Sequence, residues 1–196
     1  SHSLALRSDG RVVAWGDNGE GRCDVPADAS NSVVAIAGGG SHSLALRSDG
    51  RVVAWGDNDV PADASNSVIA ISRGISHSLA LRSDGRVVAW GDNSYGQLDT
   101  PADASNSVVA IAGGYDHSLA LRSDGRVVAW GDNGSGQCDV PADASNSVVA
   151  IAGGDAHSIA LRSDGRVVAW GDNLNGQLDV PADASNSVIA IAGGFK

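Results

Sequence analysis

Basic side chains are scarce in this sequence, and their scarcity excludes one large class of partner. Lys and Arg together number 13 against 23 Asp and Glu, which leaves a formal net charge of −10. Proteins that bind nucleic acids need a basic surface that releases counterions from the phosphate backbone. We therefore expect no nucleic-acid partner. An acidic surface of this kind is typical of a protein that its own charge keeps in solution.

Cysteine and long apolar runs are scarce as well. Cys23 and Cys138 stand where other copies of a repeat carry Leu98 and Leu178, so we expect small apolar packing from them. Two isolated cysteines form neither a metal site nor a disulfide framework, and no cofactor is expected. No apolar run approaches the roughly 20 residues of a membrane span, which indicates a soluble protein with no membrane partner. The sequence starts at Ser1 without Met or a charged-then-apolar leader, as a processed or shortened form would, and indicates no compartment.

The sequence is dominated by the stretch 41–58, which occurs five times almost unchanged. Its histidines mark the copies: His2, His42, His77, His117 and His157. These positions differ by 40, 35, 40 and 40 residues, and such a period predicts an array of stacked structural units. We divide the single expected domain into repeats 1–40, 41–75, 76–115, 116–155 and 156–196.

Each repeat is expected to form strands rather than helices. Two short apolar stretches flank a Ser-Asp-Gly turn signal, as at Ser48-Asp49-Gly50, and this pattern predicts a β-hairpin. A third strand is expected over the Val-Val-Ala-Ile-Ala stretch, and a marginal fourth before the proline. We call these strands A (Val-Val-Ala-Ile-Ala), B (His-Ser-Leu-Ala-Leu), C (Val-Val-Ala-Trp) and D. Because strands apolar on both faces must be sandwiched, the array is expected to be an all-β propeller, with a linear β-solenoid as the alternative.

The motifs that carry a family resemblance are Gly-Gly-x-x-His-Ser-Leu-Ala-Leu, Asp-Gly-Arg-Val, Ala-Trp-Gly-Asp-Asn and Gly-Gln. They resemble the regulator of chromosome condensation repeat over the whole chain. The short unit looks most like bacterial short-blade members such as the propeller-type β-lactamase inhibitor protein. The resemblance implies a propeller scaffold, commonly of seven blades, which unrelated activities share. The founding member is an exchange factor for a small GTPase at chromatin, but this chain has no wedge-like insertion and no basic tails, which argues against that role.

The identical histidines and tryptophans are interpreted as framework. Rotational symmetry keeps the five histidines apart, so we expect a side-chain bond that holds the Gly-Gly turn rather than a metal site. The five tryptophans are expected to pack between blades. They are Trp15, Trp55, Trp90, Trp130 and Trp170.

No residue set suggests catalysis. His and Ser are adjacent in every unit, and no single copy stands out as a Ser/His/Asp set, so we expect a protein that is not an enzyme. Asp17-Asn18-Gly19 lacks the alternating oxygen ligands of a calcium loop and is interpreted as a turn.

Two sites differ among the copies and are the candidate binding residues. The first is the pair before each histidine: Gly40-Ser41, Ile75-Ser76, Tyr115-Asp116, Asp155-Ala156 and the terminal Phe195-Lys196. The second follows Gly-Asp-Asn and includes Glu20, Arg22, Tyr95 and Leu174. In an up-and-down blade both sites fall on the face of the A–B and C–D connections, whereas the constant links fall on the other face.

Varied loops with exposed aromatics on a fixed scaffold favour recognition of a partner, expected to be a protein. Neutral drift of solvent-exposed loops is the competing explanation. The same pattern is compatible with a lectin-like carbohydrate-binding propeller, and with a structural or engineered module that has no ligand. In the inhibitor that the chain resembles, aromatics after Gly-Gly help contact the target enzyme, but only two of the five pairs here carry one, Tyr115 and Phe195.

The position of the two ends predicts how the propeller closes. The chain begins with strand B and ends with strand A, so a composite blade is expected in which residues 188–192 pair beside residues 2–6. This gives a closed five-bladed monomer with adjacent termini. An open arc, or an oligomer that completes a larger ring, is the alternative.

Overall fold

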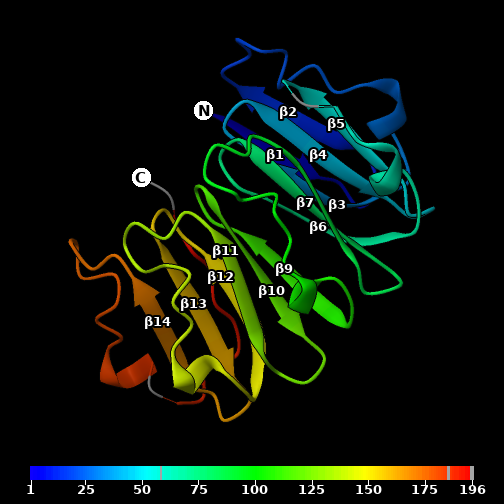
Figure 1. Ribbon diagram of the computed structural model, residues 1–196. Coiled ribbons are helices and arrows are strands. Elements are labelled where there is room, and N and C mark those ends of the chain that lie inside the picture. The colour runs from blue at the N-terminus through cyan, green and yellow to red at the C-terminus, as the bar shows by residue number, and fades with distance from the viewer. Residues whose placement is uncertain (58, 185, 195–196) are drawn as a thin grey trace.

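The computed structural model describes residues 1–57, 59–184 and 186–194. Within them the repeats form five antiparallel sheets that follow one another in chain order (Figure 1). Sheet 1 contains β1 (His2–Leu6) and β2 (Val12–Gly16), and sheet 2 contains β3 (Val33–Gly38), β4 (His42–Arg47) and β5 (Val52–Gly56). Sheet 3 contains β6 (Val68–Arg73), β7 (His77–Arg82) and β8 (Val87–Gly91). Sheet 4 contains β9 (Val108–Gly113), β10 (His117–Arg122) and β11 (Val127–Gly131), and sheet 5 contains β12 (Val148–Gly153), β13 (His157–Arg162) and β14 (Val167–Gly171).

The Ser-Asp-Gly signal forms the tight turn that joins the last two strands of each sheet. In sheet 2, Gly50 has a φ of +80°, which a residue without a side chain adopts at little cost. The Asp49 carboxylate accepts the Arg51 N–H at 3.1 Å, and the Gly50 N–H bonds to the Arg47 carbonyl at 3.0 Å. The turn fixes the register of β4 against β5, in which His42 lies opposite Gly56.

The prediction of a fourth strand before the proline is wrong for the described residues. The sheets have two or three strands, and the proline is followed by a short 3₁₀-helix. In the first repeat Val25 bonds within its own loop, to the Cys23 carbonyl at 3.0 Å, and Pro26 has no N–H to give to a ladder. The 3₁₀-helices are η1 (Ala27–Ala29), η2 (Ala62–Ala64), η3 (Ala102–Ala104), η4 (Ala142–Ala144) and η5 (Ala182–Ala184).

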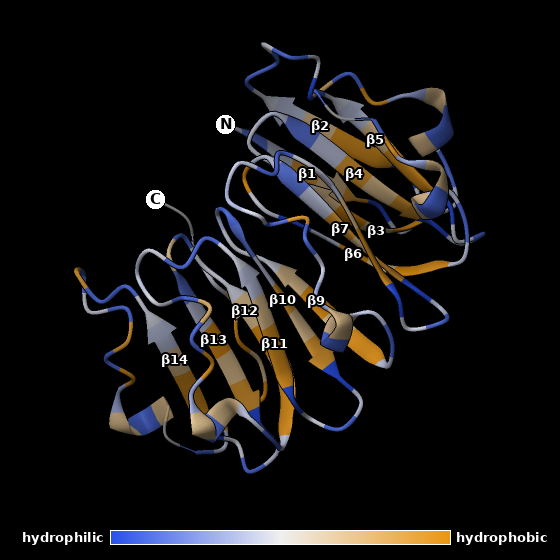
Figure 2. Cartoon of the chain, in the orientation of Figure 1, coloured by the Kyte–Doolittle hydropathy of each residue, from blue (hydrophilic) through white to orange (hydrophobic). Residues whose placement is uncertain are grey.

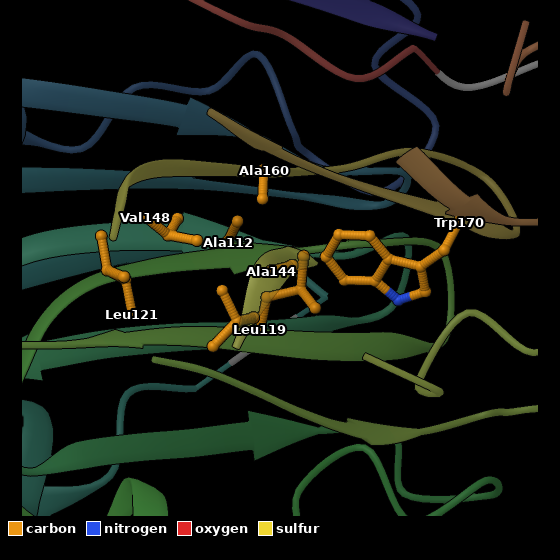
Figure 3. Close-up of a cluster of buried hydrophobic side chains, with 8 residues drawn as sticks. Ala112, Leu119, Leu121, Ala144, Val148, Ala160 and Trp170 are labelled. Atoms are coloured by element: carbon orange, nitrogen blue, oxygen red, sulfur yellow. The ribbon is translucent and has the colours of Figure 1, made fainter. Parts of the chain in front are cut away.

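The hydrophobic core lies between consecutive sheets. Strands are coloured hydrophobic over much of their length in Figure 2, whereas the connections are mostly hydrophilic. Figure 3 shows one cluster, in which Trp170 of sheet 5 packs with Leu119 and Leu121 of sheet 4. Trp170 is 6% exposed, whereas Trp15 of sheet 1, which has no sheet before it, is 54% exposed. A tryptophan is therefore buried by the preceding sheet.

The expected closure into a five-bladed ring is not seen. In the described residues β1 pairs only with β2, and 188–194 forms no strand. The Asp155 N–H instead bonds to the Gly194 carbonyl at 3.2 Å, so the C-terminal segment continues the series beside β12. The contacts between consecutive units place this segment after sheet 5 in the series of sheets, and not beside β1.

No helix in the described part of the chain is long and apolar enough to cross a membrane.

Candidate interaction surface

The first residues of the variable pairs form an inner rim that runs from sheet to sheet. The Gly40 N–H bonds to the Ile75 carbonyl at 3.1 Å, and the Ile75 N–H bonds to the Tyr115 carbonyl at 3.1 Å. The Tyr115 N–H is shared between the carbonyls of Gly154, at 3.1 Å, and Asp155, at 3.3 Å. The main chain at these positions is fixed, so only the side chains differ from one unit to the next.

The second variable site lies at the same end of the sheets as the inner rim. In sheet 4 the Asp132 N–H, which opens the loop after β11, bonds to the Asp116 carbonyl at 2.9 Å. Equivalent bonds join Asp92 to Ser76 at 3.0 Å and Asp172 to Ala156 at 2.8 Å. We call this end the variable face.

The constant links gather at the other end of the sheets, which we call the opposite face. There the Val148 N–H bonds to the carbonyl of Gly125, in the Ser-Asp-Gly turn, at 3.1 Å. The arrangement of both faces agrees with the expected strand topology.

Repeated polar side chains hold the full-length loops of the second variable site. In sheet 3 the Asn93 amide donates to Asp99 at 3.0 Å, while its oxygen accepts the Leu98 N–H at 2.8 Å. The Gln97 amide donates to Asp92 at 2.9 Å. These bonds leave the tip of the loop, which carries Tyr95, free to vary.

The described candidate residues differ in how far they reach solvent. Tyr95, Tyr115 and Leu174 are 57%, 41% and 89% exposed. Ser76 and Glu20 are exposed too, and the remaining candidates are partly buried: Gly40, Ser41, Ile75, Asp116, Asp155 and Ala156. Phe195 and Lys196 lie outside the described residues.

The Arg22 side chain is largely buried, whereas a residue that contacts a partner must be exposed. Its side chain is 11% exposed, donates to the Gly40 carbonyl at 2.8 Å and lies 3.4 Å from the Asp17 carboxylate. Its own carbonyl accepts the Ser43 hydroxyl at 3.0 Å and the Trp55 indole N–H at 2.8 Å. Arg22 therefore joins sheet 1 to sheet 2.

Sequence reasoning missed the equivalent role of Gln97 and Gln137. Both are buried, and the Gln97 carbonyl accepts the Ser118 hydroxyl at 3.0 Å and the Trp130 indole at 2.9 Å. The Gln137 carbonyl does the same for Ser158 and Trp170. The signal was the repeated Gly-Gln pair, which also appears in the family motif.

The histidines act between sheets, not within one turn as expected. The His42 Nε2 atom lies 2.9 Å from the Ser78 hydroxyl of the next sheet, and His117 lies 3.0 Å from Ser158 in the same way. The Ser158 hydroxyl donates its hydrogen to the Gln137 carbonyl, so His117 must be the donor in its bond, with the proton on Nε2. Nδ1, which has no partner, is then the bare nitrogen.

The histidine rings also explain why the turn before them needs glycine. A Cβ atom on Gly114 would lie 1.9 Å from Cε1 of His117. Burial of the rings lowers the pKa of His42, His77 and His117 to about 4. They are therefore neutral at physiological pH.

Charge is unevenly distributed over the variable face. Burial raises the pKa of Asp116, and the nearby carboxylates of Asp92, Asp132 and Asp155 raise it further. Arg73, at the end of β6, stands where the other units have glycine, and burial lowers its pKa. Arg73 also helps to line a hollow of about 280 Å³ with His2 and Ile75. Sequence reasoning missed Arg73, although its column of the repeat could have singled it out.

No group of three or more His, Cys, Asp or Glu side chains that could hold a metal is found among the described residues. Both cysteines are free, and burial raises the pKa of the Cys138 thiol to about 12.

Three solved structures illustrate what the fold is similar to. Prp20p from Saccharomyces cerevisiae matches with a TM-score of 0.75 and 25% identity, over 93% of this chain and 57% of that one. Yeast RCC1 (Prp20) bound to Kap60 matches with a TM-score of 0.78 and 22% identity, over 99% of this chain and 64% of that one. The ectodomain of the Physcomitrella patens receptor kinase CR4 matches with a TM-score of 0.75 and 23% identity, over 98% of this chain and 54% of that one. The chain thus spans less than two thirds of these relatives.

Comparison with curated protein sequences gave no match. A family model does match, and it is described as the regulator of chromosome condensation (RCC1) repeat. Its matches cover residues 1–22, 33–60, 68–97, 108–137 and 148–177, which is more than half of the chain. This match shows that the chain belongs to the RCC1 repeat family.

Proposed function

We propose that this chain is a non-enzymatic scaffold that binds a protein partner through its variable face. The observation that carries the proposal is the division of the repeat: positions that differ lie at one end of the sheets, and constant positions lie at the other. Loops that vary on a rigid framework are the usual location of binding residues. Tyr95, Tyr115 and Leu174 expose large side chains there, and aromatic residues contribute most to many protein interfaces.

The charges of the variable face favour a partner with a basic surface. The carboxylates of Asp92, Asp132 and Asp155 lie close enough to Asp116 to raise its pKa, and the protein as a whole is acidic. Complementary charge speeds association and selects among partners. Two probes are suggested: histones, which the Prp20p structure names as a binding partner, and a β-lactamase, which the resemblance of the sequence motifs to the bacterial inhibitor suggests.

No observation favours carbohydrate binding. Two hollows of about 480 and 490 Å³ lie on the opposite face, around the turns at Asp49 and Asp164. Their linings contain no aromatic side chain on which a sugar ring would stack.

The test is a binding titration of each probe with the immobilised protein. Tyr115→Ala is expected to weaken binding about tenfold, because a partly exposed aromatic at the centre of an interface contributes about 1–2 kcal/mol. The matched control is Asp124→Ala on the opposite face, where Asp124 accepts hydrogen bonds from the Arg122 side chain and the Arg126 N–H. If Asp124→Ala weakens binding and Tyr115→Ala does not, the partner binds the opposite face and the proposal is wrong. If neither probe binds, histones and the β-lactamase are excluded as partners, and the proposal has no supporting measurement.

A further inference from the structure

In the full-length loops of the second variable site, one residue joins two consecutive sheets. The carbonyl of Gln97 accepts the indole N–H of Trp130 in the following sheet at 2.9 Å, and its side-chain amide donates to Asp92 of its own repeat at 2.9 Å. Gln137 makes the two equivalent bonds at the next junction. This single residue thus satisfies a donor on one side of the junction and an acceptor on the other.

Arginine in this position makes the same pair of contacts. The Arg22 carbonyl accepts the Trp55 indole N–H at 2.8 Å, and its guanidinium lies 3.4 Å from the Asp17 carboxylate. The residue before it, Gly21, has a φ of +70°, and the equivalent Gly96 has a φ of +78°. Because glycine adopts such a φ at little cost, the element that fits a junction is a tight turn with glycine before a long side chain that can donate.

The junction between sheets 2 and 3 lacks this element, because the loop after β5 is five residues shorter. The indole N–H of Trp90 has no hydrogen-bond partner, although the side chain is only 6% exposed. Asp57, which is equivalent to Asp92, is exposed and has neither glutamine nor arginine in its loop. We call Trp90 and Asp57 the unfilled pair. They are the equivalents of the donor and the acceptor that Gln97 binds at the junction after them.

The surface beside the unfilled pair is also less covered than at the junction after it. Ser76 is exposed, whereas Asp116 in the equivalent position is partly buried. A Cβ atom on Gly131 would lie 3.1 Å from the Cα atom of Gln97 in the preceding repeat. At the equivalent point on Gly91, the three nearest atoms all belong to its own repeat. The short loop therefore leaves Ser76 and Gly91 open to solvent, where a loop from another molecule can reach them.

We propose that the unfilled pair binds a tight turn of a protein partner in which a glycine precedes an arginine. The carbonyl of this arginine accepts the Trp90 N–H, its guanidinium pairs with the Asp57 carboxylate, and the turn covers Ser76 and Gly91. The proposal rests on the function proposed above, because it states which chemistry the variable face recognises at this junction.

Charge favours arginine over glutamine in the partner's turn. Asp57 and Asp59 are both exposed in the short loop, and 57–61 contains no basic residue. A guanidinium beside these carboxylates adds attraction across the interface, and arginine is among the residues that contribute most to binding. Arg22 shows that an arginine fits a turn of this geometry.

The probe is the synthetic peptide acetyl-Ser-Tyr-Gly-Arg-Leu-amide, which has the length of the missing segment and the sequence 94–98 with arginine in place of Gln97. Added to isotope-labelled protein, it is expected to shift the indole N–H resonance of Trp90 and to slow the exchange of that proton with solvent. The resonance of Trp130, whose indole already has an acceptor, is expected to stay in place. Trp90→Phe removes one indole resonance and so identifies it.

Matched variants show which groups hold the peptide. Trp90→Phe is expected to weaken binding about fivefold, because one hydrogen bond is lost, whereas Trp130→Phe leaves the affinity unchanged. A peptide with alanine in place of arginine is expected to bind about threefold more weakly, since an exposed ion pair contributes little. Insertion of Ser-Tyr-Gly-Gln-Leu between positions 58 and 59 rebuilds the full-length loop and is expected to abolish binding.

Two results would overturn the proposal: no binding of the peptide, or binding that neither Trp90→Phe nor the inserted loop weakens. The inserted loop also separates this proposal from the proposed function. If the chain with the inserted loop loses the peptide but still binds histones or the β-lactamase with full affinity, the unfilled pair is not the site of the partner. Binding by the variable face would then stand, and Tyr115→Ala tests it independently.

Discussion

At the scale of single residues, the four inner tryptophans are equivalent in sequence but not in bonding. Trp55, Trp130 and Trp170 donate to a carbonyl of the preceding loop, whereas the indole N–H of Trp90 is buried without a partner. The second repeat is five residues shorter after Gly-Asp-Asn, and so it lacks the residue that supplies this carbonyl. Comparison of the copies predicts that Trp90 belongs to the framework. It does not predict the missing hydrogen bond of its indole, because that bond depends on a loop in the neighbouring unit.

Tryptophan substitutions separate the packing of the ring from its hydrogen bond. Trp90→Ala is expected to lower the free energy of unfolding by about 3–5 kcal/mol, because it empties a core site. Trp15→Ala, at the exposed end of the series, should cost much less. Trp130→Phe should cost about 1 kcal/mol more than Trp90→Phe, since only Trp130 loses a hydrogen bond. Urea denaturation of the four variants gives these values, and equal costs for the two phenylalanine variants would contradict this difference in bonding.

The buried histidines predict a loss of stability in mild acid. In the folded state the pKa of His117 is lowered from 6.5 to about 4 by burial, so the unfolded chain binds a proton there that the folded chain refuses. Stability from this group is complete above pH 6.5 and is lost as the pH falls from 6.5 to 4, by at most about 3 kcal/mol. Unfolding free energies measured between pH 7 and 4.5 should show a steep decline, which His117→Gln makes shallower. A decline that His117→Gln leaves unchanged would show that His117 takes up its proton equally in both states.

At the scale of structural elements, the sequence predicts turns and the strands beside them well, but it predicts poorly whether a segment pairs at the edge of a sheet. The Ser-Asp-Gly turn and its two strands are confirmed in each repeat, because a positive φ at Gly50 and a carboxylate cap at Asp49 are decided within a few residues. The expected marginal fourth strand is absent, and after Pro141 the chain instead forms a 3₁₀-helix in which Ala144 is fully buried. Whether such a segment pairs depends on what lies beside it.

Two glycines of the fourth repeat provide a matched test of the turn. Gly125 has a φ of +79°, and a Cβ atom there would lie 2.8 Å from the Ser147 nitrogen. Gly134, in the loop after β11, has only the flexible Asp132 carboxylate near that point, at 3.4 Å. Gly125→Ala is therefore expected to lower the free energy of unfolding by about 1–3 kcal/mol, and Gly134→Ala by less than about 0.5 kcal/mol. Thermal unfolding of both variants is the measurement, and a stable Gly125→Ala would mean that the turn adjusts.

At the scale of the whole molecule, the sequence predicts the unit but not the angle between units. Five copies with a common period indicate stacked sheets, and the family match agrees. Closure depends on the sum of small rotations between sheets, which contacts such as Gly113 against Arg73 determine. No short stretch of sequence records that sum, which is why the expected composite sheet is absent while the position of the variable loops is correct.

The backbone bonds of the inner rim also bear on how such a chain can change by mutation. Gly40, Ile75 and Tyr115 are joined through main-chain atoms, so residues with three different side chains continue the same run of backbone bonds. The second repeat is five residues shorter in its outer loop, yet the hairpin before that loop keeps the same register as the others. A shorter loop and different side chains on the variable face are thus compatible with one backbone path, so a duplicated repeat can change its outer contacts while the sheet beneath them keeps its register.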